Sequence, residues 1–119
     1  THLQQVIAFL LNRMPMSQAQ DEPMVNIVAA YRKNKWRLLV FPRRQHKPWQ
    51  FFAEGPKQIH ISPGCAALTG IIHLPAGRTW PELTENTLKD ILGQVSINKN
   101  FYNQLKQELS QGIPHTHKN

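Results

Sequence analysis

The sequence is poor in cysteine and in long apolar runs, and each shortage excludes a class of protein. Its 119 residues include one cysteine, Cys65. A single cysteine cannot form an internal disulfide, which excludes a disulfide-stapled scaffold and favours a reducing compartment such as the cytoplasm. No apolar run approaches the roughly 20 residues of a membrane-spanning helix, and no signal peptide is recognisable. We therefore expect a cytoplasmic protein with no membrane partner.

Acidic residues are also scarce, with 7 Asp and Glu against 14 Lys and Arg, which gives a formal net charge of +7. An excess of positive charge favours anionic partners such as nucleotides, phosphate esters, nucleic acids or acidic proteins. A merely basic surface, or the basic part of a larger protein, gives the same composition. Hydrophobic residues make up 40% of the chain, which indicates a folded domain rather than a disordered one.

Familiar catalytic signatures are missing from the sequence. It has no phosphate-binding P-loop, no dinucleotide glycine fingerprint, no paired cysteine motif and no Gly-x-Ser-x-Gly element. Cys65 follows a Pro-Gly break without a neighbouring base, and His60 is interpreted as a solvent-facing or hydrogen-bonded sheet histidine. His115 and His117 form a pair in a polar tail, which is more often unstructured than a metal site. We predict no catalytic residue, no metal site and no cofactor in this chain.

What is present is an alternation of helical and strand patterns that predicts an α+β fold in a single domain over residues 1–119. Apolar residues at helical spacing predict helices over residues 3–14, 84–95 and 99–111. Period-two or continuous apolar patterns predict an antiparallel sheet, flanked by these helices, with strands over residues 24–31, 36–41, 57–62 and 69–74. The domain then divides into a helix (1–15), a linker (16–23), a sheet core (24–75), a helical part (76–112) and a tail (113–119).

The first two predicted strands form a β-hairpin around a short polar turn. On the second strand Trp36, Leu38 and Val40 share one face, whereas Leu39 and Phe41 share the other. A strand that is apolar on both faces is either covered on both or lies in a sheet whose second face meets a partner.

A basic loop follows the hairpin and is the strongest candidate for a binding site. Arg43, Arg44, His46 and Lys47 lie within five residues at the exit of a strand. Two guanidinium groups and an ammonium can clamp phosphate oxygens, and Ser62, beside a Pro-Gly break, can add a hydroxyl. The alternative is an ordinary solvated basic turn. If the loop binds nucleotide phosphates, we expect binding to be lost chiefly when Arg43 is replaced.

The aromatic run after the loop, Trp49-Gln50-Phe51-Phe52, has two interpretations. Exposed aromatic rings next to cations can stack a nucleobase. Aromatic side chains are more often part of a core, and we expect this of at least two of the three rings.

Several short motifs stand in an order that resembles one family. They are Phe41-Pro42-Arg43, His46-Lys47-Pro48, Phe52-Ala53-Glu54-Gly55 and Ile61-Ser62-Pro63. The same order is typical of the C-terminal domain of the ATP adenylyltransferase family, which includes the diadenosine tetraphosphate phosphorylases. The chain is most similar to bacterial relatives of unknown function that also resemble GDP-galactose phosphorylase. The resemblance covers residues 22 to about 97.

The resemblance implies a histidine-triad-like half-domain of the galactose-1-phosphate uridylyltransferase-like branch. In that family a strand of the N-terminal half carries the nucleophilic histidine in a His-x-His-x-His or His-x-His-x-Gln motif. Here the segment Gln58-Ile59-His60-Ile61-Ser62 has only the central histidine, so His60 is not assigned that role. The resemblance thus implies the non-nucleophilic C-terminal half of a nucleotidyltransferase or nucleotide phosphorylase, which helps to bind a nucleotide or phosphate ester.

The partners that follow are an upstream half of the same protein and a second copy of the chain. Because the first residue is Thr1 rather than Met, we expect the sequence to be part of a longer protein. Two alternatives remain open: a module that binds nucleic acid through the basic loop, which the resemblance disfavours, and a structural or dimerisation domain without enzymatic role. A steep dependence of oligonucleotide affinity on salt would favour the first alternative.

Overall fold

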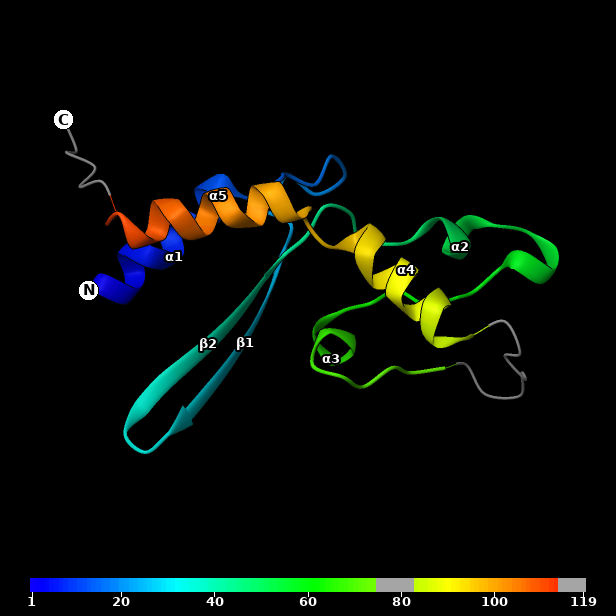
Figure 1. Ribbon diagram of the computed structural model, residues 1–119, viewed down its shortest axis with the longest axis horizontal. Coiled ribbons are helices and arrows are strands. Elements are labelled where there is room, and N and C mark those ends of the chain that lie inside the picture. The colour runs from blue at the N-terminus through cyan, green and yellow to red at the C-terminus, as the bar shows by residue number, and fades with distance from the viewer. Residues whose placement is uncertain (75–82, 114–119) are drawn as a thin grey trace.

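The computed structural model describes residues 1–74 and 83–113. Its helices and strands are α1 (His2–Arg13), β1 (Val25–Arg32), β2 (Lys35–Pro42), α2 (Trp49–Phe52), η1 (Gly55–Lys57), α3 (Cys65–Leu68), α4 (Glu85–Val95) and α5 (Lys99–Ser110). The fold is α+β, as predicted, and the sheet in the described part of the chain consists of β1 and β2 (Figure 1). None of the described helices has the length and apolar character needed to cross a membrane.

The helices α1, α4 and α5 confirm the three predicted helices within one residue at each end. Each begins after a polar cap: Thr1, Thr84 and Asn98 each accept a hydrogen bond from the backbone N–H three residues later. These caps satisfy N–H groups that have no partner within the first helical turn, which is why the helices begin where they do.

The hairpin is also confirmed, with Arg32 opposite Lys35 and Val25 opposite Pro42. Its two-residue turn places Lys33 and Asn34 at φ angles of 51° and 60°. Two successive residues with positive φ are the mark of a type I′ turn, whose twist matches that of the flanking strands. The Tyr31 hydroxyl donates a hydrogen bond to Asn34 Oδ1 at 2.5 Å, which ties the turn to the strand before it.

The predicted strand over residues 57–62 is wrong, although its alternation was real. Ile59 and Ile61 are buried and His60 between them is exposed. The Ile59 N–H, however, donates to the Gln50 carbonyl at 2.9 Å instead of to a strand. The Ile61 N–H donates to the Ile59 carbonyl at 2.8 Å, and Lys57 belongs to η1. The segment therefore lies outside the sheet, and its apolar face packs on α4.

The predicted strand over residues 69–74 is wrong as well. No described residue of this segment is in a strand; the segment follows the short helix α3, which ends at Leu68 with Thr69 as its C-cap, and Gly70 then has a φ of 104°. The Gly70 N–H bonds to the Ala67 carbonyl and the Ile71 N–H to the Ala66 carbonyl, which is the hydrogen-bond pattern of a Schellman motif. Gly70 therefore terminates this helix, since its positive φ suits glycine.

A small core lies beneath α4. Ile59, Ile61 and Ile91 are each less than 5% exposed and pack together, with Leu83 and Leu88 at the edge of the cluster. Because Ile59 and Ile61 come from the extended segment and Ile91 from α4, this core fixes the position of α4 over the chain that precedes α3.

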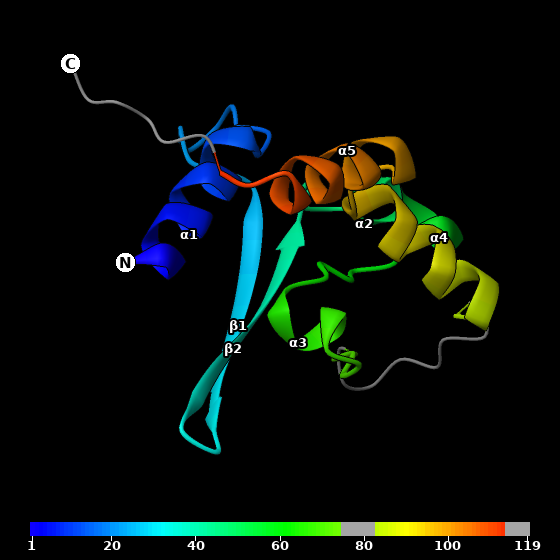
Figure 2. The ribbon, with the colours of Figure 1, turned by 60° about the vertical axis from the view of Figure 1, so that its left-hand side comes forward.

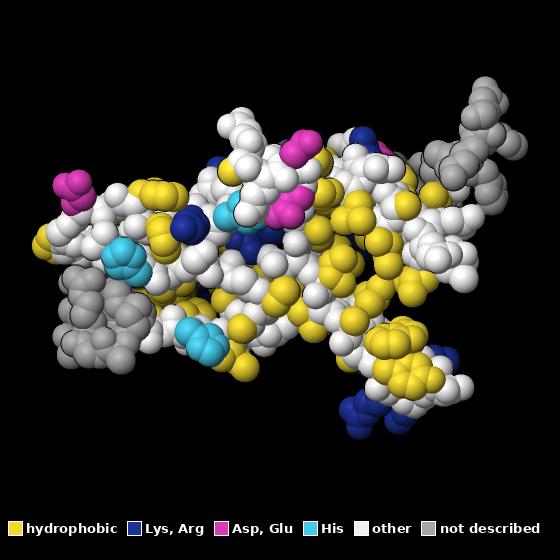
Figure 3. Space-filling model, turned by 180° about the vertical axis from the view of Figure 1, so that it is seen from behind, with side chains coloured by type: hydrophobic (Ala, Val, Ile, Leu, Met, Phe, Trp, Pro, Cys, Tyr) yellow, Lys and Arg dark blue, Asp and Glu magenta, His cyan; other side chains and the backbone are white. Residues whose placement is uncertain are grey.

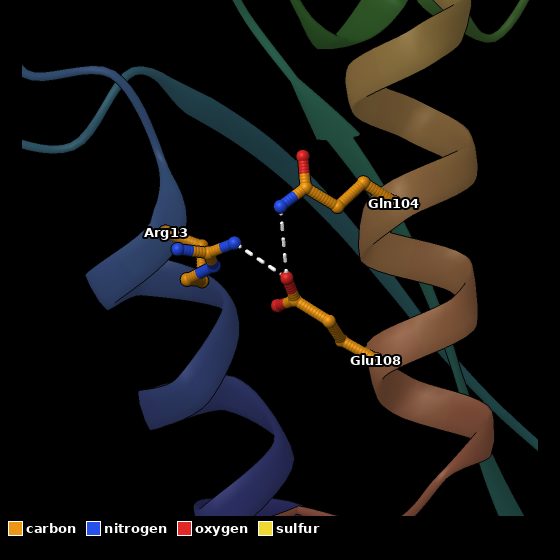
Figure 4. A network of polar contacts seen from close by, with 3 residues as sticks. All are labelled: Arg13, Gln104 and Glu108. Atoms are coloured by element: carbon orange, nitrogen blue, oxygen red, sulfur yellow. Dashed lines mark hydrogen bonds and ion pairs between the residues drawn. The ribbon is translucent and has the colours of Figure 1, made fainter.

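The two terminal helices meet at the other end of the molecule. Arg13 Nη2 of α1 forms an ion pair with Glu108 Oε1 of α5 at 2.6 Å, and Gln104 Nε2 donates to the same oxygen at 3.1 Å (Figure 4). Met14, which follows Arg13 in the sequence, and Leu105 of α5 are both buried. The hairpin starts from this end and extends away from the helices, so its turn is remote from them (Figures 1 and 2).

Candidate functional site

Arg43 of the basic loop is buried, with 2% of its surface exposed. Its Nε donates to the Val95 carbonyl at 3.2 Å, and its Nη1 donates to Asn26 Oδ1. Its Nη2 donates to the carbonyls of Gln45 and His46 at 3.2 and 3.0 Å. Burial lowers the pKa of the guanidinium below its ordinary value. The structure thus gives Arg43 a different role from the expected phosphate contact: it joins β1, the loop and α4.

The other predicted site residues lie in separate surroundings. Arg44 and His46 are exposed. Lys47 Nζ lies 3.9 Å from the centroid of the Phe51 ring, in a cation–π contact. Ser62 is exposed and lines a small hollow together with Cys65, away from the basic loop in sequence. The five predicted residues therefore do not form a single clamp, and phosphate binding by Arg44, His46, Lys47 and Ser62 stays a prediction.

A larger hollow of about 530 Å³ lies between α2, η1 and α4. Its lining consists of Trp49, Gln50, Pro56, Lys57, Ile59, Asn86, Thr87 and Asp90. The volume is within the range of small-molecule sites, which are mostly apolar with a few placed polar groups. This hollow is the best candidate site in the described part of the chain.

A polar network fixes one wall of the hollow. Gln50, only 4% exposed, donates from Nε2 to Asp90 Oδ2 at 2.8 Å. Gln94 donates from Nε2 to the same oxygen at 2.9 Å and to Gln50 Oε1 at 3.1 Å. Gln94 Oε1 in turn accepts from the Trp49 backbone N–H at 2.9 Å. Because each group restrains the next, α2 is held on α4 and the Asp90 carboxylate is oriented before any ligand arrives.

The aromatic run is more exposed than expected. Trp49 is 53% and Phe52 is 70% exposed, while Phe51 is half-buried against His60, with ring centroids 5.5 Å apart. The expectation that at least two of the three rings belong to the core is wrong. Pro48, which is fully buried, anchors the start of α2, so this four-residue helix presents Trp49 to the hollow.

Sequence reasoning missed Lys57, Asn86 and Asp90. Asn86 and Asp90 lie four residues apart on α4 and therefore share one face of the helix. That spacing was readable, but nothing in the sequence indicated that η1 and Lys57 would face them. Bringing Lys57 to α4 depends on burial of the neighbouring Ile59, which was assigned to a strand.

Histidines and the cysteine form no metal site in residues 1–74 and 83–113, where no three His, Cys, Asp or Glu side chains cluster. Cys65 is exposed, and His73 borders the same hollow, of about 270 Å³. The His115 and His117 pair lies outside the described residues.

Comparison of the chain with models of known protein families, with curated proteins and with solved structures finds no significant match. The function is therefore argued below from the geometry of the hollow, with the family resemblance as a hypothesis beside it.

Proposed function

We propose that this chain is a nucleotide-binding domain, the non-nucleophilic C-terminal half of a cytoplasmic nucleotidyltransferase or nucleotide phosphorylase. The observation that carries the proposal is the hollow between α2 and α4, with an exposed tryptophan, a lysine and a fixed carboxylate on its walls. The order of motifs that resembles the ATP adenylyltransferase family supports the same function.

Each wall of the hollow suits a different part of a nucleotide. The indole of Trp49 offers a flat surface on which a base can stack. Asp90 accepts hydrogen bonds but cannot donate, so it favours a base edge that carries N–H groups. The Lys57 ammonium supplies a compact charge for phosphate oxygens. Arg44, His46 and Lys47 precede α2 and add to the positive field on the phosphates.

The chain lacks an activated nucleophile in this proposal. His60, the central residue of the triad-like segment, is exposed and contacts the Phe51 ring edge-on. Nucleotidyl transfer through histidine needs a nucleophile oriented by neighbouring groups. We therefore expect no turnover of dinucleoside polyphosphates or nucleoside diphosphate sugars by the isolated chain, and we place the nucleophile in an upstream half. Turnover that His60→Ala abolishes would contradict this assignment.

Calorimetric titration with ATP, GDP and inorganic tripolyphosphate tests the site. Removing a base-stacking ring costs about 1–3 kcal/mol, so Trp49→Ala should weaken nucleotide binding about 5- to 150-fold. Tripolyphosphate has no base, and its affinity should fall with Lys57→Ala rather than with Trp49→Ala. Phe52→Ala is the matched control, because Phe52 is an exposed ring of the same helix outside the hollow.

Two results would contradict the proposed function. The first is equal nucleotide affinity in the wild type and in Trp49→Ala. The second is much tighter binding of long oligonucleotides than of mononucleotides, with a steep loss of affinity on adding salt, which would indicate a nucleic-acid-binding module instead.

A further inference from the structure

One face of the hairpin consists entirely of uncharged side chains. The register places four cross-strand pairs on it, which we call the hairpin face: Val25–Pro42, Ile27–Val40, Ala29–Leu38 and Tyr31–Trp36. Cross-strand partners share a face, and neighbouring pairs alternate between faces. Arg32, Lys35 and Arg37 consequently all lie on the opposite face.

Much of the hairpin face is open to solvent in the isolated chain. Ile27 is 38%, Tyr31 57% and Trp36 62% exposed. The rings of Tyr31 and Trp36 lie 5.1 Å apart between centroids and cover the end of the face near the turn. In Figure 3 hydrophobic side chains run from the hairpin, at the lower right, towards the body of the molecule.

The hairpin face continues at its base into a hollow of about 180 Å³. Val40 and Pro42 of the face line this hollow together with Leu10 of α1 and Leu105 and Leu109 of α5. Lys106 is the charged residue in its lining. An apolar surface thus extends from the turn of the hairpin to the two terminal helices.

The chain exposes more surface than a monomer of its size. A mass of 13.7 kDa corresponds to about 6,600 Å² in a folded monomer, whereas this chain exposes 9163 Å². Its radius of gyration is 17.1 Å, against about 13.5 Å for a compact domain of this length. The excess is roughly three times the ~800 Å² that each partner buries in a standard interface. A two-stranded sheet is also only marginally stable without a covering layer.

We propose that the hairpin face docks a second copy of this chain in a two-fold symmetric dimer. In such a dimer the same patch meets itself, so the patch must not bring like charges together. The hairpin face satisfies this condition even though the chain carries a formal charge of +7, because the hairpin's cations project from the other side. An anionic partner would instead be drawn to that other side. This inference concerns residues separate from the nucleotide hollow and goes beyond the proposed function.

Sedimentation equilibrium of the chain over a range of concentrations tests the proposal, with circular dichroism to confirm folding. The wild type should sediment as a dimer at micromolar concentration. Trp36→Lys should weaken association at least tenfold, because it places a charge in the apolar face that the two copies would bury. Leu39→Lys is the matched control: Leu39 is 53% exposed on the same strand but lies on the opposite face, so the dimer should persist. Tyr31→Lys provides a second disruptive variant, should Trp36→Lys fail to fold.

Three outcomes would overturn the inference. They are a wild type that stays monomeric at hundreds of micromolar, equal weakening by Trp36→Lys and Leu39→Lys, and a longer form of the protein that is monomeric with the hairpin face covered by its own upstream half. Trp49→Ala should leave the dimer intact, so failure of the nucleotide site and failure of the dimer are distinguishable.

Discussion

The basic loop and the turn of the hairpin both concentrate positive charge, yet the fold uses their cations in opposite ways. In the loop, Arg43 is buried and donates to four oxygens from three parts of the chain. At the turn, Arg32, Lys33 and Lys35 are exposed. The difference teaches that charge in a sequence does not by itself locate a ligand. A guanidinium surrounded by carbonyl oxygens is part of the fold, whereas an exposed cation is available to a partner.

The apolar residues of the segment over residues 57–62 and those of the hairpin also differ in burial. Ile59 and Ile61 alternate with exposed residues and are buried on α4, whereas Trp36 and Leu39 are more than half exposed. The two isoleucines thus have their packing partners within the described chain, whereas the hairpin presents exposed apolar side chains. Substitutions that act differently on the two regions test this difference.

The largest effect is expected from Arg43→Ala. It removes the buried donor of the Gln45 and His46 carbonyls and of the Asn26 side chain, while the Val95 carbonyl keeps the Arg44 backbone N–H, so we expect a loss of about 3–5 kcal/mol in the free energy of unfolding. Urea denaturation measures it. Arg44→Ala removes the same charge one residue later at an exposed position and should change stability by less than about 0.5 kcal/mol. Similar losses in the two variants would show that net charge, rather than the buried contacts, is responsible.

The next largest effect is expected from Ile91→Ala in the core under α4. Ile91 is 1% exposed against Ile59 and Ile61, and truncating such a side chain costs about 2–4 kcal/mol. Leu39→Ala on the hairpin removes a similar volume from an exposed site and should cost less than about 0.5 kcal/mol in the monomer. Thermal unfolding of both variants at low protein concentration makes the comparison. A large cost for Leu39→Ala would mean that the hairpin is already covered within one chain.

The sequence predicted well whatever depends on local chemistry. The capped helices needed only Thr1, Thr84 and Asn98 before a helical apolar stripe, and the hairpin needed only two apolar strands around a polar turn. Neither requires knowledge of a distant partner, because the hydrogen bonds involved join residues close together in the chain.

What depends on distant contacts was not predicted. The segment over residues 57–62 has strand periodicity, but its backbone bonds to Gly55, Gln50 and Ile59 instead of to a strand, and its isoleucines are buried on α4. Alternation reports which side chains are buried and does not report what the backbone pairs with. The hollow was missed for the same reason, since Lys57 and Asp90 are separated by more than thirty residues and meet only through that packing. The role of Arg43 depends on Val95, which is 52 residues away in the sequence.

A stabilising change is expected at the turn of the hairpin. Lys33 has a positive φ of 51°, which side chains other than Asn and Gly adopt at a cost of about 1 kcal/mol. Lys33→Asn places a residue that tolerates positive φ at the first position of this type I′ turn and keeps Asn34 as the acceptor of the Tyr31 hydroxyl, so it should stabilise the hairpin by about 1 kcal/mol. Amide hydrogen exchange of β1 and β2 measures the gain locally.

Gly70→Ala, which puts a Cβ on a residue of positive φ, tests the same backbone preference with the opposite sign. Gly70 has a φ of 104° with open space around it, so Gly70→Ala should be destabilising through backbone strain rather than through a clash. Faster exchange in the Lys33→Asn variant would show that the turn does not limit the stability of the hairpin.

The smallest effect is expected for the ion pair that joins α1 to α5. The Arg13 and Glu108 side chains are 37% and 31% exposed and meet at 2.6 Å, but Arg13 Nε is buried without a hydrogen bond to any described residue. Solvent screening and that unsatisfied donor both reduce the net gain, so a double-mutant cycle with Arg13→Met and Glu108→Gln should give a coupling of about 0.5 kcal/mol. Raising the salt concentration should diminish it. The Glu85–Lys89 pair, which is 80% and 70% exposed within α4, provides the reference, with a coupling of about 0.3 kcal/mol. A coupling above 2 kcal/mol for Arg13 and Glu108 would mean that α1 and α5 are joined by a desolvated ion pair. The polar groups at this end of the molecule would then be bonded within the chain, as those around Arg43 are.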